Sequence, residues 1–248
     1  MPTAPTRTSD PLTLVQLLWA PGTRVGRSGT TVGAITDAAI ALADRSGLDA
    51  LTMRAVAEQV GVGAMTLYGY VPGKTELLEL MLDRVAAATY EGHPRPADLP
   101  DWRSALHHVA QRNYEHALAH GWSVEIPAAR PILGPGICLK YEAELTPLDG
   151  IGLRDEEMDH VLTSVLHLAT SAARWEVATE RVRAASQLTD EQWWRLSEPV
   201  LTTVMAGLDL PVSSRVGQTL QSAADPSGTL ATGVAVLLDG VAARLARS

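Results

Sequence analysis

Residues 38–83 read AAIALADRSGLDALTMRAVAEQVGVGAMTLYGYVPGKTELLELMLD. Their apolar residues recur every three or four positions, which is the spacing of amphipathic helices. The sequence therefore predicts consecutive helices over Val32–Asp44, Met53–Val60, Ala64–Tyr70 and Lys74–Tyr90. We expect Thr31 to cap the first helix and Ser46-Gly47 to end it, because hydroxyls favour helix starts and glycine favours helix ends.

The two short helices have the features of a helix-turn-helix. Gly61-Val62-Gly63 joins them, and the small Ala57 lets them cross closely. Val56, Val60 and Leu67 are expected to form the buried wedge between them. Because the second helix of such a motif enters the DNA major groove, the pattern favours a DNA-binding module.

Charge limits how such a module could bind DNA. The chain has 248 residues with 20 Lys and Arg against 28 Asp and Glu, a formal net charge of -8, which excludes a broadly basic nucleic-acid coat. Residues 1–84 carry 7 basic and 8 acidic side chains, whereas residues 85–248 carry 13 and 20. DNA contact must therefore be local, with about three to five phosphate contacts per half-site.

Helical spacing continues along the rest of the chain, and the alternation typical of half-buried strands is missing. Further helices are expected over residues 101–120, 137–145, 155–183, 190–205 and 229–247, with loops over 122–136 and 206–228. The predicted fold class is all-α. It consists of a flexible arm over 1–31, a three-helix helix-turn-helix DNA-binding domain over 32–84, and a larger helical ligand-binding and dimerisation domain over 85–248.

The quoted stretch resembles the tetracycline-repressor (TetR) family of bacterial transcriptional regulators. The likeness includes Leu67-Tyr68, Tyr70-Val71 and Gly73-Lys74. A weaker likeness covers GVAVLLDGVAARLAR, residues 233–247, which is similar to the last helix of many actinobacterial members. Gly69 departs from the family, which usually has a larger residue at that position.

The resemblance implies a repressor that binds a pseudo-palindromic double-stranded DNA operator as a homodimer and is released by a small effector. The implied DNA-contacting residues are Arg54, Gly63, Ala64, Met65, Thr66, Tyr68, Tyr70 and Lys74. Threonine and tyrosine hydroxyls can bond phosphate oxygens, and an apolar side chain can contact a thymine methyl group. In the arm, Arg24 and Arg27 lie on a glycine-rich run that suits either a DNA minor groove or a solvated tail.

Polar residues interrupt the helix faces of the second domain. On its first helix they share one arc with Trp102, and they could be satisfied core side chains or the wall of a ligand site. On the long helix a stripe of uncharged polar residues lies opposite the apolar face, and it could be a dimer seam or a pocket wall. The candidate effector-binding residues are Trp102, Asn113, His116, His120, Tyr141, His160, Ser164, His167, Ser171 and Trp175. Their Trp and Tyr rings favour a hydrophobic or aromatic effector.

The sequence lacks the residues that a phosphate-binding loop or a metal site would require. Gly73-Lys74-Thr75 has no glycine five residues earlier, as a P-loop requires, and the pair His116 and His120 has no evident third metal ligand. We therefore predict no catalytic residue, no cofactor and no metal. No apolar stretch approaches the roughly 20 residues that cross a bilayer, so a cytoplasmic protein without a membrane partner is expected. The alternative function is an all-α small-molecule-binding protein or enzyme that keeps the helix-turn-helix only as scaffold.

Overall fold

The computed structural model describes residues 11–26, 29–127, 131–220 and 225–247. Its helices and strands follow in this order along the chain: α1 (Pro11–Leu18), β1 (Arg24–Val25), β2 (Thr30–Thr31), α2 (Val32–Ala50), α3 (Met53–Gln59), α4 (Ala64–Tyr68), α5 (Lys74–Ala87), η1 (Pro96–Asp98), α6 (Trp102–Ala119), η2 (Ser123–Glu125), α7 (Pro135–Leu145), η3 (Thr146–Leu148), α8 (Asp155–Ser186), α9 (Asp190–Val204), α10 (Pro211–Leu220) and α11 (Pro226–Leu245). The all-α prediction is confirmed, because the two paired strands have only two residues each.

Local side chains account for where the N-terminal helices begin and end. The Thr31 hydroxyl accepts a hydrogen bond from the Ala34 amide at 3.1 Å, so the predicted cap of α2 is confirmed. Thr52 caps α3 in the same way, by accepting from the Ala55 amide at 3.1 Å. Gly47 has a φ of 75°, so the helical path breaks there although a further turn continues to Ala50.

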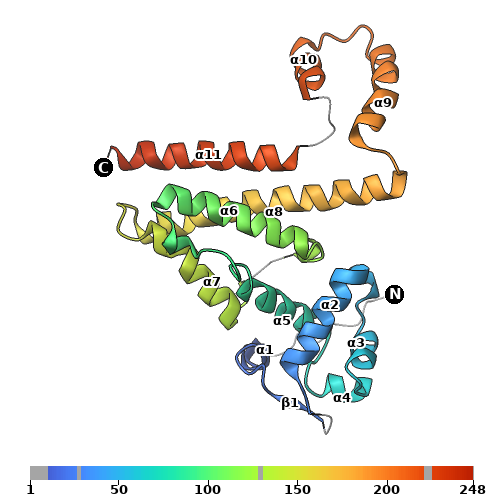
Figure 1. Cartoon of the computed structure of the whole chain (residues 1–248), viewed down its shortest axis with the longest axis vertical. Helices are drawn as coiled ribbons and strands as arrows, with labels where there is room; N and C mark the ends of the chain where they lie inside the picture. Colours follow the sequence, from blue (N-terminus) through green and yellow to red (C-terminus); the bar gives the residue numbers. More distant parts are fainter. Residues whose placement is uncertain (1–10, 27–28, 128–130, 221–224, 248) are drawn as a thin grey trace, which may run out of the picture.

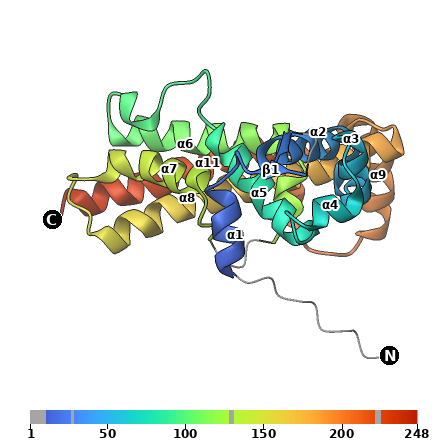
Figure 2. The same ribbon diagram turned by 90° about the horizontal axis from the view of Figure 1, so that it is seen from below.

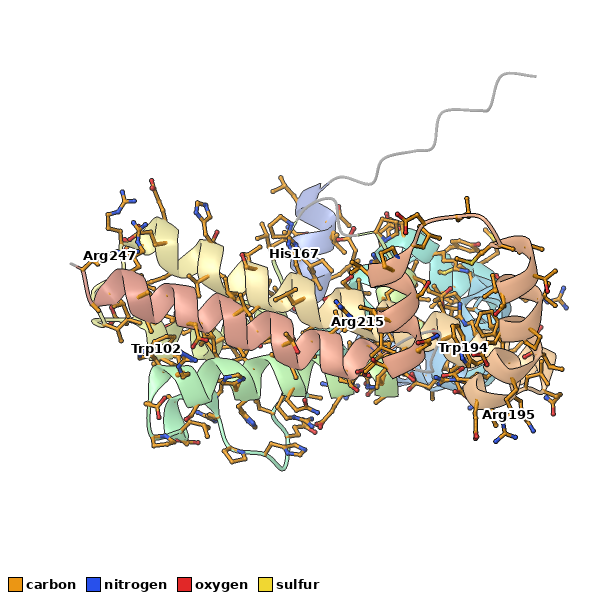
Figure 3. The ribbon with its side chains drawn as sticks, turned by 90° about the horizontal axis from the view of Figure 1, so that it is seen from above. Trp102, His167, Trp194, Arg195, Arg215 and Arg247 are labelled. Carbon is orange, nitrogen blue, oxygen red and sulfur yellow. The ribbon has the colours of Figure 1, made fainter. Side chains whose placement is uncertain are left out.

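The chain folds around two hydrophobic cores. The first joins α2 to α5 and also contains Leu18, Val25 and Trp122. The second core lies between α6, α8 and α11. Figure 3 shows α11 lying along both α6 and α8, and Figure 1 shows α6 and α8 between α11 and the helix-turn-helix.

Part of the predicted flexible arm is ordered in the structure. Helix α1 packs Leu14, Leu17 and Leu18 on the first core, and the Trp19 indole donates a hydrogen bond to the Leu133 carbonyl at 2.8 Å. These contacts join segments far apart in the sequence, so the local composition on which the arm prediction rested could not reveal them. Arg27 lies outside the described residues.

Two C-terminal features also differ from the prediction. Helix α10 lies inside the predicted loop over 206–228, and α9 and α10 together extend away from the body without a buried residue of their own (Figure 1). Helix α11 begins three residues and ends two residues earlier than predicted, and its length and composition alone would allow it to cross a bilayer. Its Leu230, Val234 and Leu238 are buried in the second core, but only 22% of its most apolar window is buried, and Val236 is exposed.

Candidate nucleic-acid interface and effector region

Helix α4 presents most of its side chains outward. Leu67 is fully buried in the first core and fixes the rotation of the helix about its axis. The Met65 side chain is therefore 84% exposed and that of Tyr68 is 47% exposed, with Thr66 exposed between them. Gly63 precedes the helix, Ala64 is half-buried, and Gly69 ends the helix two residues earlier than the prediction. The result is a short helix whose outward surface has two hydroxyls and one thioether.

A β-hairpin lies beside this helix. Val25 is fully buried and anchors strand β1, while β2 leads directly into α2. The hairpin comes so close to α4 that a Cβ added at Gly26 would be 3.0 Å from the Thr66 methyl carbon. Figure 2 shows β1 and α4 on the same face of the molecule, so the exposed Arg24 lies next to the predicted recognition surface.

The predicted backbone-binding cations already have intramolecular partners. Arg54 donates to the Glu58 carboxylate at 2.8 Å on the exposed side of α3. The Lys74 ammonium donates to the Leu48 carbonyl at 2.8 Å and thereby joins the start of α5 to the end of α2. Tyr70 is half-buried and packs against the first core, so only part of its surface is available to DNA.

A polar network links the two cores at the junction of α2, α5 and α6. One Asp44 carboxylate oxygen lies 2.8 Å from His120 Nδ1 and accepts from the Trp122 indole at 2.6 Å. One turn earlier on α6, His116 Nε2 lies 2.7 Å from the Val85 carbonyl oxygen. Burial, reinforced by the neighbouring His120, lowers the pKa of His116 to about 4, so this imidazole is neutral near pH 7 and donates to that carbonyl.

Buried polar groups form hydrogen bonds that hold helix α7 against α5 and α6. The fully buried Glu144 carboxylate accepts from the Tyr90 hydroxyl at 2.8 Å, the Asn113 amide at 2.7 Å and the Lys140 ammonium at 2.8 Å. Burial, together with the adjacent Glu144 charge, raises the pKa of the Tyr90 phenol. At the other end of α7, the buried Asp83 carboxylate accepts from the Ile137 amide at 2.8 Å.

The structure does not gather the predicted effector residues into one cavity. Asn113, His116 and His120 belong to the polar contacts just described. The Tyr141 hydroxyl donates to Asp159 at 2.7 Å, and Trp102 packs beside the second core with the Arg103 guanidinium 5.8 Å from its ring centre. Trp175 lines a hollow of about 350 Å³ between α8 and α9, together with Trp193.

The predicted polar stripe of α8 is exposed along its whole length. His160, Ser164, His167 and Ser171 all lie on the surface, and Figure 3 shows His167 on the outer side of α8. The Ser164 hydroxyl donates to the His160 carbonyl within the same helix at 2.7 Å. The adjoining α11 also leaves apolar surface uncovered, since Val236 is 66% exposed and Gly240 is exposed. In the described chain these residues line a surface rather than a pocket.

Comparison with known proteins assigns the chain to a family. The model "Bacterial regulatory proteins, tetR family" matches residues 35–81, and "Tetracyclin repressor-like, C-terminal domain" matches residues 95–245. The chain belongs to the TetR family. It is 36% identical over 209 residues to the HTH-type transcriptional repressor DrrR1 of Streptomyces coeruleorubidus, covering 82% of this chain and 76% of that protein.

Solved TetR-family structures have the same fold. Apo ActR from Streptomyces coelicolor superposes with a TM-score of 0.69 at 24% identity, covering 88% of this chain and 97% of ActR. ActR in complex with actinorhodin gives a TM-score of 0.68 at 22% identity, covering 87% and 98%. The family resemblance stated from the sequence is therefore confirmed, and this TetR-family chain is a transcriptional regulator and not an enzyme. Among the residues that the structure describes, no cluster of three or more His, Cys, Asp or Glu could hold a metal ion.

Sequence reasoning missed several polar residues that hold helices together in this TetR-family regulator. Asp44 was predicted only as the end of a helix, and Lys140 with Glu144 has the spacing of an exposed ion pair. Trp122 lies at the start of the predicted loop over 122–136, yet it is buried in the first core. Their partners are distant in sequence. The only sign of them in the sequence is the unusual density of polar residues on one face of α6, which indicates that another element packs against that face.

Proposed function

We propose that this TetR-family regulator is a cytoplasmic, homodimeric repressor that binds a pseudo-palindromic operator through α4 and is released by a small hydrophobic effector. The observation that carries the proposal is the exposed α4 surface, on which Thr66 and Tyr68 are held outward by the buried Leu67. Two copies of α4 about 35 Å apart would enter successive major grooves.

The exposure of each side chain and its hydrogen bonds within the protein indicate which part of the DNA it contacts. Thr66 and Tyr68 contact bases or phosphates, while Met65 or Ala64 contacts a thymine methyl group. Arg54 and Lys74 hold the phosphate backbone, although each must first share or leave a partner within the protein. The ordered hairpin favours a DNA contact by Arg24 over a solvated tail, because Val25 fixes its distance from α4.

Two exposed helix faces support dimerisation. The uncharged stripe of α8 and the small apolar residues of α11 lie side by side on helices that already pack together (Figure 3). Exposed surfaces of monomeric proteins are usually charged, so a partner helix pair is the better match for this one. The role of His160, Ser164, His167 and Ser171 is thus in the dimer seam, and Trp175 remains the best candidate for an effector contact.

An operator titration tests the proposal. DNA fragments from around the gene's own promoter are titrated with the full chain at moderate salt, with Thr66→Ala and Tyr68→Phe as variants. Each variant is expected to weaken binding about tenfold, because it removes one hydrogen-bonding group worth about 1–1.5 kcal/mol. Thr202→Ala, which removes the same kind of hydroxyl from an exposed position of α9, is the matched control and should bind the promoter like the wild type.

Outcomes that contradict the proposal are clear-cut. Unchanged promoter binding by both hydroxyl variants would leave the helix-turn-helix as scaffold only. A promoter affinity that stays the same at saturating effector would exclude induction by that compound, since coupling between the two sites is reciprocal.

A further inference from the structure

A cleft of about 540 Å³ separates the DNA-binding domain from the second domain. It lies between α2 on one side and the ends of α6 and α8 on the other, which face each other in Figure 1. Its volume falls within the range of ligand sites. None of the family-implied DNA contacts and none of the predicted effector residues lines it, although His120 is bonded to the lining residue Asp44.

The lining of this junction cleft is apolar with an excess of negative charge. Alanine, leucine and valine side chains and the buried Trp122 ring form much of its wall. Its charged groups are four carboxylates and one guanidinium: Asp44, Glu125, Glu176, Glu180 and Arg181. That guanidinium already pairs with Glu125, so it cannot neutralise the other three.

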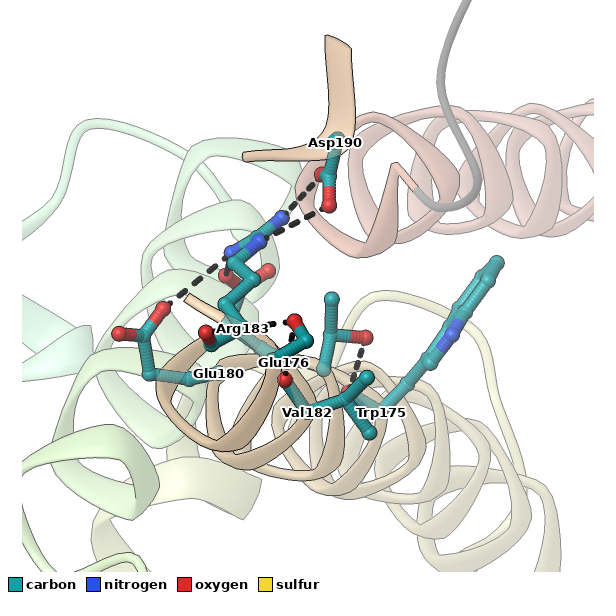
Figure 4. Close-up of polar contacts among 8 residues, drawn as sticks. Trp175, Glu176, Glu180, Val182, Arg183 and Asp190 are labelled. Atoms are coloured by element: carbon teal, nitrogen blue, oxygen red, sulfur yellow. Dashed lines mark hydrogen bonds and ion pairs between the residues drawn. The ribbon is translucent and has the colours of Figure 1, made fainter. Parts of the chain in front are cut away.

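The remaining carboxylates receive little compensation from their neighbours. Glu176 and Glu180 share a single guanidinium, that of Arg183, at 3.1 and 3.4 Å. Figure 4 shows that the same Arg183 also binds Asp190, so one positive charge serves three negative ones. Asp44 is bonded to a histidine and an indole, of which the indole carries no charge. A positive charge placed in the cleft would therefore be favoured, and a negative one disfavoured.

We infer that the junction cleft binds an organic cation with a hydrophobic body. The body contacts the apolar wall and Trp122, and the charge lies near Glu176 and Glu180. Such a ligand touches both domains, through Asp44 on α2 and through Glu176 on α8.

The first test measures binding without DNA. Isothermal titration of the full chain compares tetraphenylphosphonium with tetraphenylborate, two ions of the same shape and opposite charge. The cation is expected to bind at least about tenfold more tightly than the anion. The double variant Glu176→Gln/Glu180→Gln should lose about tenfold in cation affinity. Ala119→Trp, which fills the cleft from the exposed end of α6, should abolish binding.

A matched control separates the cleft from overall charge. Glu191→Gln/Glu198→Gln makes the same charge change on exposed positions of α9 and should bind the cation like the wild type. Circular dichroism of each variant verifies that it is folded. Equal affinity for the two ions, or equal losses in the two double variants, would overturn the inference. If the chain binds the cation but does not bind promoter DNA, the proposed function is wrong, while the preference of the cleft for cations over anions still holds.

Discussion

The DNA-facing surface and the domain junction are built in opposite ways. On α4 the outward side chains of Met65, Thr66 and Tyr68 are exposed, and one buried leucine orients them. At the junction and on the adjoining α7, the side chains of Asp44, Asp83, His116 and Glu144 all have hydrogen-bond partners on another helix or loop. The first arrangement leaves groups free for a macromolecule, and the second fixes helices against each other. Substitutions should therefore affect function at α4 and stability at the junction.

The largest expected effect is at Glu144. Glu144→Ala leaves the Tyr90 hydroxyl, the Asn113 amide and the Lys140 ammonium without their common acceptor. Breaking a buried charged network in this way costs about 3–5 kcal/mol of unfolding free energy. Chemical denaturation measures the loss, and Glu142→Ala, an exposed carboxylate on the same helix, is the control. Similar midpoints for the two variants would mean that the Glu144 network contributes nothing.

The second largest effect is expected at Gly136, and it tests whether neighbouring atoms leave room for a larger side chain there. A Cβ at Gly136 would overlap the Asp83 carbonyl oxygen, because α7 begins directly against α5. Helix propensity alone predicts that Gly136→Ala stabilises α7 by about 1 kcal/mol. We expect the steric term to dominate and the variant to lose about 3 kcal/mol. Gly217→Ala is the control, since a Cβ there meets only Trp194 at an ordinary 3.7 Å. A more stable Gly136→Ala protein would show that α7 is not tightly docked.

The amino-acid sequence predicted the DNA-binding end far better than this junction. Helix α4 begins at the predicted residue because a glycine turn and a buried leucine, all within ten residues, define it. The junction depends on pairs such as Asp44 with Trp122, which are 78 positions apart. Nothing local to either residue indicates the other. For the same reason α1 was missed, because its order depends on contacts with α5 and with Leu133.

The pH dependence of stability should report on His116. Its folded-state pKa is about 4, below the 6.5 of an unperturbed histidine, so the unfolded chain takes up the proton first as the pH falls. The stability that this residue contributes is complete above pH 6.5 and is lost toward pH 4. Between pH 7.5 and 5 the wild type should lose up to about 2 kcal/mol more than His116→Gln. His107→Gln, an exposed position on the same helix, should follow the wild type, and parallel profiles for all three proteins would contradict the assignment.

The smallest effect returns to the helix-turn-helix. Gly61 has a φ of 70°, and a Cβ added there would meet nothing within 4 Å, so backbone conformation alone requires glycine. Gly61→Ala should therefore cost only about 1–2 kcal/mol, without the packing defect expected at Gly136. Because the strain falls on the turn that sets the angle between α3 and α4, promoter affinity should fall along with stability, unlike in Gly136→Ala. Thermal unfolding combined with promoter titration distinguishes the two glycines. A loss of stability as large as that of Gly136→Ala would mean that the turn is packed rather than open.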